Sequence, residues 1–200
     1  MRFIAIILPG LLVIFLLFQS FMKRNLSNIE NQPYRVIRKS GDLEIRYYPP
    51  ATMATVKTDA RNYRELSSSG FRRVAGYIFG NNEEGTKIAM TSPVHMDIRE
   101  TGSSMSFVMP SGYDTSNLPR PMDSGIEISN TKAEYAAAIS FSGYASDKSI
   151  REHAVKLESL LAEKGIKPIG NYRFLGYDPP YQLTGRRNEV IVAIEWKETD

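Results

Sequence analysis

The longest apolar stretch of the chain lies at its amino terminus. Residues 3–18 are apolar except for the Pro9-Gly10 pair, and residues 19–22 extend the stretch to about 20 residues, the length that a helix needs to cross a bilayer core of about 30 Å. Arg2 and Lys23-Arg24 border it, and no small-x-small cleavage site follows. The pattern favours an uncleaved transmembrane anchor over residues 1–24, with a cleaved signal peptide as the alternative.

Residues 25–33 are polar and predict a short linker, which leaves residues 34–200 for one domain. Basic residues on the two sides of the anchor are nearly balanced, so they do not fix its orientation. An N-terminal signal-anchor usually leaves a short tail inside. We therefore expect a single-pass membrane protein with its domain on the outer, periplasmic side.

The first half of the domain predicts strands around one helix. Extended runs at residues 34–37, 43–47 and 52–58 come first, and later runs at residues 87–90 and 105–109 predict two more strands. The helix is expected over residues 63–79, where Asn62 and Glu65 stand in a capping-box relation. Its apolar stripe comprises Tyr63, Leu66, Gly70, Val74, Tyr77 and Ile78.

The second half repeats this order of elements. Strands are expected at residues 126–128, 135–141, 172–177 and 190–196, and a second helix is expected to open at Ser149 and run to about Lys164 before Gly165. An offset of 83 residues places Leu43-Glu44-Ile45 on Ile126-Glu127-Ile128, and one of 86 relates the later strands. We therefore predict an α+β domain of two pseudo-repeated strand-helix-strand units, with a ligand groove along the seam between them.

Composition narrows the classes of function. The formal net charge is +3, and because Arg2, Lys23 and Arg24 lie in or beside the anchor, the remainder of the chain is formally neutral. A neutral domain argues against nucleic-acid binding, which needs a clustered cationic surface. The chain has no cysteine, which excludes disulfides and thiolate chemistry.

One face of the first helix is a candidate ligand surface. At 100° per residue, Ser68, Arg72, Gly76 and Phe79 lie opposite the apolar stripe. Small Ser68 and Gly76 would admit a flat ring close to the backbone, Phe79 offers it an apolar surface, and Arg72 offers a cation. A solvated helix face with one exposed aromatic residue is the alternative interpretation.

Several ordered motifs resemble the SOUL haem-binding protein family. They are the segments at residues 87–94, 107–111, 118–121, 141–144, 177–180 and 185–190, and the similarity extends from about Tyr34 to Trp196. The resemblance implies a distorted β-barrel with two main helices, related to the effector-binding domains. It also implies reversible binding of haem or another tetrapyrrole as cofactor or cargo.

The chain departs from this family at positions that contact haem in some members. Where such members carry a histidine proposed as an iron ligand, this chain has Tyr47, which rules out an imidazole ligand at that position, although a phenolate can ligate ferric haem. Family positions with basic residues thought to hold propionates correspond here to Ser68, Gly76 and Gln182. We therefore expect iron to be weakly ligated or not ligated, with Arg72 replacing the missing cations.

Other candidate residues lie near the predicted final hairpin. Tyr177 and Tyr181 flank an Asp-Pro-Pro turn that borders the expected groove, and Arg186 is a candidate for contact with a ligand carboxylate. A structural turn, in which the arginine donates to backbone carbonyls and Glu189 pairs with a neighbouring arginine, is the competing interpretation. His95 and His153 have no second ligand at metal spacing, so no dedicated protein-metal site is expected.

Taken together, these features predict a membrane-tethered binding module for haem or a related hydrophobic tetrapyrrole, acting as a carrier or buffer. Motifs of hydrolases, phosphate-binding loops and zinc proteases are missing from the sequence, so an enzyme is the less favoured class. Three alternatives remain. They are an effector-binding or sensor domain for another amphipathic small molecule, a hydrolase of the wider effector-binding superfamily, and a protein-interaction domain.

Overall fold

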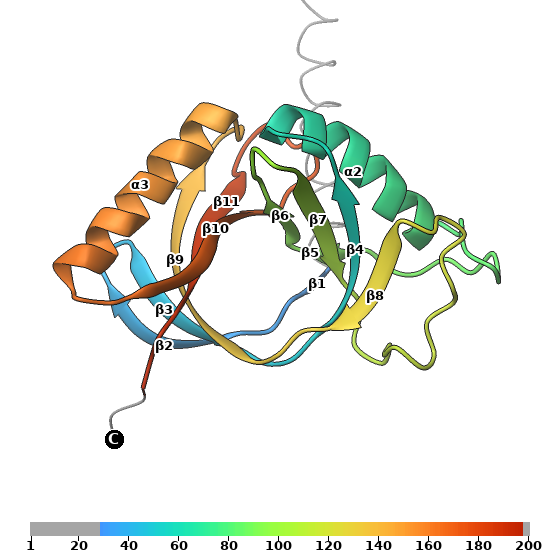
Figure 1. Ribbon diagram of the computed structural model, residues 1–200, viewed down its shortest axis with the longest axis horizontal. Helices are drawn as coiled ribbons and strands as arrows, with labels where there is room; N and C mark the ends of the chain where they lie inside the picture. The colour runs from blue at the N-terminus through green and yellow to red at the C-terminus, as the bar shows by residue number, and fades with distance from the viewer. Residues whose placement is uncertain (1–28, 198–200) are drawn as a thin grey trace, which may run out of the picture. The chain divides into compact units, whose positions relative to one another are not determined.

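A computed structural model describes residues 29–197 of the chain. The chain divides into two units, Met1–Glu30 and Asn31–Asp200, and the helices and the main sheet belong to the second. Its helices are α2 (Tyr63–Ile78) and α3 (Asp147–Glu163) (Figure 1). Nine strands form one antiparallel sheet in the order β2-β3-β9-β11-β10-β6-β7-β4-β8. They are β2 (Arg35–Ser40), β3 (Leu43–Tyr48), β4 (Thr52–Thr58), β6 (Val94–Asp97), β7 (Ser103–Val108), β8 (Ile126–Asn130), β9 (Glu134–Ser142), β10 (Pro168–Gly176) and β11 (Arg187–Ile194). The short strands β1 (Glu30–Asn31) and β5 (Thr91–Ser92) form a separate pair.

The order and pairing of the strands follow the predicted two-repeat pattern. The first repeat runs β3-β4-α2-β6-β7, and the second runs β8-β9-α3-β10-β11. An offset of 83 residues maps Ile45 onto Ile128 and Ala54 onto Ala137, and the sheet pairs Ile45 with Ala137 and Ala54 with Ile128. The first strand of each repeat therefore pairs with the second strand of the other. This exchange joins the two repeats into one sheet.

The sheet is open, so the expected barrel is wrong. The outer strands β2 and β8 each pair with a single neighbour. Closure would require β2 to accept a second partner, but it carries exposed Arg35, Arg38 and Lys39. Charged side chains along an edge strand disfavour further pairing. The α+β class and the two main helices are as predicted.

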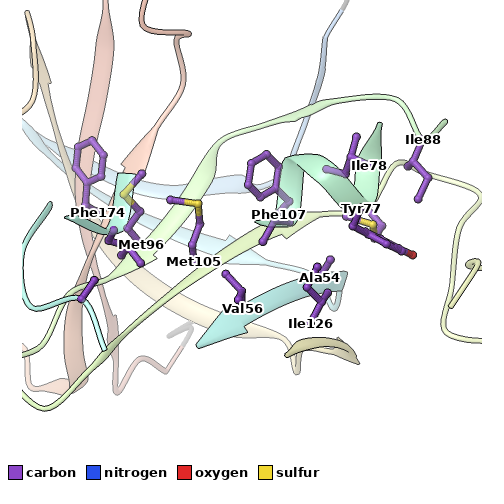
Figure 2. Close-up of a cluster of buried hydrophobic side chains, with 14 residues drawn as sticks. Ala54, Val56, Tyr77, Ile78, Ile88, Met96, Met105, Phe107, Ile126 and Phe174 are labelled. Atoms are coloured by element: carbon purple, nitrogen blue, oxygen red, sulfur yellow. The ribbon is translucent and has the colours of Figure 1, made fainter. Parts of the chain in front are cut away.

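Each helix covers the strands of its own repeat. Helix α2 packs on β4 and β7, and α3 packs on β9, β10 and β11. The stripe predicted for α2 faces the sheet, with Tyr63 half-buried at its start and the other members buried. Figure 2 shows the cluster beneath α2, which includes Tyr77, Phe107 and Met105. A second cluster beneath α3 contains Leu157, Leu161, Ile139 and Val192.

Local sequence explains where the helices begin. The Asn62 side chain accepts a hydrogen bond from the Glu65 backbone N–H at 2.9 Å, and Glu65 accepts one from the Arg61 N–H at 3.0 Å. For α3 the prediction was displaced by one turn, because the N-cap is Ser146 and its capping-box partner is Ser149. Serine occupies both the N-cap and the N3 position of this capping box. The prediction took Ser149 for the N-cap and therefore placed the start of the helix three residues too late. Gly165 ends this helix at φ 64°, as predicted.

Other segments differ from the sequence-based expectation. Residues 87–90 are irregular rather than a strand, and the missed strand β6 begins at Val94, just after Pro93. Within residues 29–197, neither helix combines the length and the apolar composition needed to cross a membrane. The anchor expected over residues 1–24, together with the first four residues of the linker, lies outside the described residues.

Candidate functional site

A groove lies where the two repeats meet. The central strands β6 and β10 pair there through Met96 and Phe174, and Figure 2 shows these two side chains at one end of the cluster beneath α2. The start of α2 and the first turns of α3 flank this pair. The resulting cavity of about 340 Å³, called the seam groove below, confirms the groove predicted from the duplication. It is lined by Arg61, Asn62, Met96, Ile98, Arg99, Glu100, Asp147, Ile150, Arg151, Ala154, Tyr172 and Phe174.

The seam groove combines an apolar base with a charged margin that also includes the carboxylates Glu100 and Asp147. Met96 and Phe174 are buried at the base, whereas Arg61 and Arg151 are exposed. Arg99 is paired with Asp97 and so is already neutralised. Among the described residues, the guanidinium groups of Arg61 and Arg151 form no ion pair. An apolar surface edged by free arginines fits a hydrophobic molecule that carries carboxylates.

Tyr172 adds an unsatisfied polar atom to this lining. Its hydroxyl oxygen is buried and has no hydrogen-bond partner within residues 29–197. Burial, with the nearby Glu158 charge, raises the pKa of the Tyr172 phenol. A buried hydroxyl without a partner is costly, so a ligand that supplied a hydrogen-bond acceptor would relieve that cost.

A second polar constellation lies on the opposite face of the sheet. Because Leu43 and Ile45 pack beneath α3, the alternate residues Glu44, Arg46 and Tyr48 of β3 face away from the helices. There Arg46 Nη1 lies 2.6 Å from Glu189 Oε2, and Arg46 Nη2 lies 2.9 Å from Oε1. The sequence analysis did not single out Arg46. A charged residue next to the buried apolar positions of a strand is nevertheless a signal that could have identified it.

Glu189 is saturated with donors. Besides Arg46, its carboxylate accepts hydrogen bonds from Arg187 Nη2 at 2.7 Å, Tyr177 OH at 2.8 Å and Ser140 Oγ at 3.0 Å. Burial alone would raise the pKa of Glu189, but the bonds and charges of Arg46 and Arg187 outweigh burial and lower it to about 2. A carboxylate this acidic is a poor general base near neutral pH. The constellation therefore fits a structural junction of β3, β9, β10 and β11.

The residues predicted on α2 lie as expected on its solvent face. Ser68 and Arg72 are exposed, Gly76 is half-buried and Phe79 is 57% exposed. Arg72 forms no ion pair among the described residues. Ser68 borders an open hollow of about 960 Å³ together with Ser69, Arg73 and Lys57. The exposure of this face is thus confirmed, whereas its role in binding stays a prediction.

The remaining predicted site residues are dispersed. Tyr47 packs against Tyr135, with ring centroids 5.2 Å apart, and Tyr181 is 55% exposed on the loop after β10. Tyr177 belongs to the Glu189 junction. Buried Arg186 donates from Nη1 to the carbonyl oxygens of Pro179 at 2.6 Å and Gln182 at 3.0 Å. None of the eight predicted residues lines the seam groove.

Neither histidine is presented to the groove as a ligand. His95 is buried on the face away from the helices, where its Nε2 lies 2.7 Å from Gln32 Oε1. His153 Nδ1 lies 2.7 Å from the Ser149 carbonyl oxygen, and its ring stacks on Phe141 at 4.1 Å. Residues 29–197 contain no group of three or more His, Cys, Asp or Glu side chains arranged to hold a metal ion.

Comparison with known proteins is consistent with this arrangement. The model of the SOUL heme-binding protein family matches residues 29–193. Heme-binding protein 2 of Mus musculus is 32% identical over 168 residues, covering 79% of this chain and 80% of the mouse protein. Heme-binding protein 1 of Xenopus laevis is 28% identical over 176 residues, covering 82% of this chain and 92% of the frog protein.

Solved structures share the fold at low sequence identity. The C-terminal domain of EcmrR aligns with a TM-score of 0.56 and 11% identity, covering 81% of this chain and 98% of that domain. A hydrolase encoded by lin2189 from Listeria innocua aligns with a TM-score of 0.53 and 9% identity, covering 80% and 94% of the two chains. At these identities the likeness concerns the fold alone.

Proposed function

Since the chain belongs to the SOUL heme-binding protein family, we propose that it binds haem or a related tetrapyrrole in the seam groove. The observation that carries this proposal is the pairing of an apolar base, Met96 and Phe174, with two arginines free of carboxylate partners, Arg61 and Arg151. A porphyrin presents a flat apolar body with two carboxylates on one edge. Apolar contact and charge-assisted hydrogen bonds are the two interactions that this lining supplies.

The donor set of the groove fits the porphyrin better than it fits the iron. Only Met96, through its thioether, and Tyr172, through its phenol, are ligand types known for haem iron within the lining. Bound iron would supply redox and ligand-exchange chemistry, but a thioether or a protonated phenol is a weak partner for it. Binding by the porphyrin body favours a reversible carrier or buffer over a redox haemoprotein.

The membrane tether is part of the same proposal. Residues 1–24 would hold the domain on the outer, periplasmic side of the membrane. This would keep it close to the bilayer, into which hydrophobic porphyrins partition. Support comes from the length of the apolar run and its basic borders. Extraction separates the alternatives: a tethered chain stays with membranes through high-salt and alkaline washes, whereas a chain released from a cleaved signal peptide does not.

An effector-binding or sensor function for a different amphipathic molecule is the second candidate. It is favoured by the same groove, since an apolar base with two cations does not by itself select a tetrapyrrole. The exposed face of α2, with Arg72 and Phe79, is the competing location for the ligand.

Absorbance titration of the full-length chain tests the proposed function. Haem and metal-free protoporphyrin IX should each shift the Soret band, with saturation at one equivalent. Their two affinities should lie within about tenfold of each other, because a weak iron ligand adds at most about 1.4 kcal/mol, which corresponds to a tenfold change in affinity. A much tighter haem complex would show that an iron ligand dominates. Absence of saturable binding by both, with thermal stabilisation by other amphiphiles, would favour the sensor function.

A further inference from the structure

A separate cavity lies at the far end of α3, away from the seam groove. It occupies about 310 Å³ between the β2-β3 hairpin, the segment after α3 and the residues that follow β11. Its lining consists of Arg38, Ser40, Leu43, Ile45, Lys164, Ile166 and Trp196. It shares no lining residue with the seam groove.

The base of this cavity is apolar. Leu43 and Ile45 are each 2% exposed and belong to the core cluster beneath α3, and half-buried Ile166 and Trp196 pack against the same cluster. The volume is within the range of small-molecule pockets, at its lower end. Such a base accepts the alkyl or aryl body of a small ligand.

The mouth of the cavity carries positive charge that has no counter-charge. Three neighbouring lysines are paired: Lys39 with Glu44 at 2.8 Å, Lys156 with Asp42 at 2.6 Å, and Lys167 with Glu195 at 3.3 Å. By contrast, Arg38 and Lys164 contact no carboxylate within residues 29–197. Lys164 Nζ donates only to Ser40 Oγ, at 3.1 Å.

Trp196 provides a further unsatisfied donor. Its indole Nε1 is buried and donates to no acceptor among the described residues. Lys164 is also the C-cap of α3, a position where the helix dipole favours a cation. The cavity thus has an apolar base and donors in excess of acceptors.

We propose that this cavity is a binding site for an amphipathic monocarboxylate, such as a medium-chain fatty acid. Its apolar body would lie on Leu43 and Ile45, and its carboxylate would lie between Arg38 and Lys164. A carboxylate supplies both the negative charge and the acceptor that the mouth lacks. A neutral alcohol of the same length supplies an acceptor but no charge, and a quaternary ammonium amphiphile supplies neither.

The sole tryptophan of the chain makes the test direct, because Trp196 lines the cavity. Decanoate, titrated into the full-length chain below its micellar concentration, should change the tryptophan emission with saturation at one equivalent, and calorimetry should give the same stoichiometry. Decanol and decyltrimethylammonium should bind at least tenfold more weakly. Failure of decanoate to bind by both methods, or equal binding of decanol, overturns the proposal.

Matched variants separate the site from general charge effects. The double change Arg38→Ala and Lys164→Ala should weaken decanoate binding at least tenfold. The double change Lys39→Ala and Lys167→Ala removes the same net charge from paired lysines and should leave the affinity within twofold. Equal loss in both, or in neither, contradicts the assignment. Replacement of Arg61 and Arg151 should leave decanoate binding unchanged, which separates this site from that for the tetrapyrrole.

Discussion

Arg46 and Glu189 form a doubly hydrogen-bonded ion pair that reaches across the intervening strand β9, with 1% and 0% of their side chains exposed. Arg46 comes from the first repeat and Glu189 from the second. The pair therefore fixes the strand exchange that joins the two repeats. Tyr34 completes it from outside, with its ring 4.2 Å from the Arg46 guanidinium carbon and its hydroxyl accepting from Arg187 at 2.9 Å.

Removing one partner of this pair should be strongly destabilising. We expect Arg46→Ala to lower the free energy of unfolding by about 3–5 kcal/mol, because it leaves the Glu189 carboxylate buried with fewer counter-charges. Denaturant unfolding measures the loss. Arg64→Ala, on the exposed side of α2, is the control and should change stability by less than about 0.5 kcal/mol. A loss below about 1 kcal/mol for Arg46→Ala would mean that the junction is not structural.

Tyr177 should contribute to stability rather than to ligand binding. Burial and the Glu189 charge raise the pKa of its phenol, so it stays protonated and donates to Glu189 at 2.8 Å. Tyr177→Phe should cost about 1–2 kcal/mol, since the acceptor keeps its other donors. Haem affinity should stay within twofold of the unsubstituted chain. A large loss of affinity with unchanged stability would instead place Tyr177 in the ligand site.

His95 should make the fold sensitive to mild acid. Burial, reinforced by the charge of Arg173, lowers the pKa of His95 from 6.5 to about 3, with Glu189 opposing the shift and Gln32 at 2.7 Å. The unfolded chain therefore binds this proton first, and stability falls as pH drops from 6.5 towards 3, by up to about 1.4 kcal/mol per pH unit. Glu189 affects the pH dependence of stability only below about pH 4.5, because its pKa is lowered from 4.5 to about 2 in the folded chain.

Comparing the chain with its His95→Gln variant isolates this effect. The slope of the unfolding free energy against pH reports the number of protons that the chain takes up on unfolding. Between pH 6.5 and pH 5 this number should be smaller in the variant by close to one. Equal slopes in the two proteins would show that His95 takes up its proton without unfolding the domain.

Two glycines of α2 should respond in opposite directions to alanine. A Cβ at Gly70 would meet Leu66 Cδ1 at 3.1 Å and Met105 Cβ at 3.3 Å, whereas a Cβ at Gly76 meets nothing closer than Asn81 Cβ at 4.0 Å. Gly76→Ala should gain about 0.5–1 kcal/mol from helix propensity. At Gly70 overpacking should exceed that gain and give a net loss of about 1 kcal/mol. Thermal unfolding checks both, and a gain at both positions would contradict the close packing of α2 on β7.

The parts of the fold that local patterns determine were predicted well. Strand β4 matches its predicted range, and α2 differs only at its last residue. The offset of 83 residues related the two halves correctly, but the pairing of β3 with β9 and of β4 with β8 comes from the structure alone. The open sheet was not predicted, because closure depends on whether the edges β2 and β8 meet in space. Strand β6 was missed because Val94–Asp97 is short and follows a proline, and its partner β10 lies far along the chain.

A groove at the seam was predicted, but the residues that line it were not singled out from the sequence. Duplication implied a groove at the seam, and the seam groove lies there. Its arginines come from three separate segments, so no spacing in the sequence brings Arg61, Arg99 and Arg151 together. Arg186 illustrates the reverse case: a basic motif suggested contact with a ligand, whereas its guanidinium donates to the carbonyls of its own turn.

The most direct measurement is haem titration of three variants of the full-length chain. Arg61→Ala combined with Arg151→Ala should weaken haem at least tenfold, and Ala154→Trp, which fills the groove from α3, should do the same, while circular dichroism shows the fold intact. Arg72→Ala, on the exposed face of α2, should bind haem as the unsubstituted chain does. Loss of binding in Arg72→Ala alone, with both groove variants unaffected, would contradict the seam groove and place the tetrapyrrole on α2.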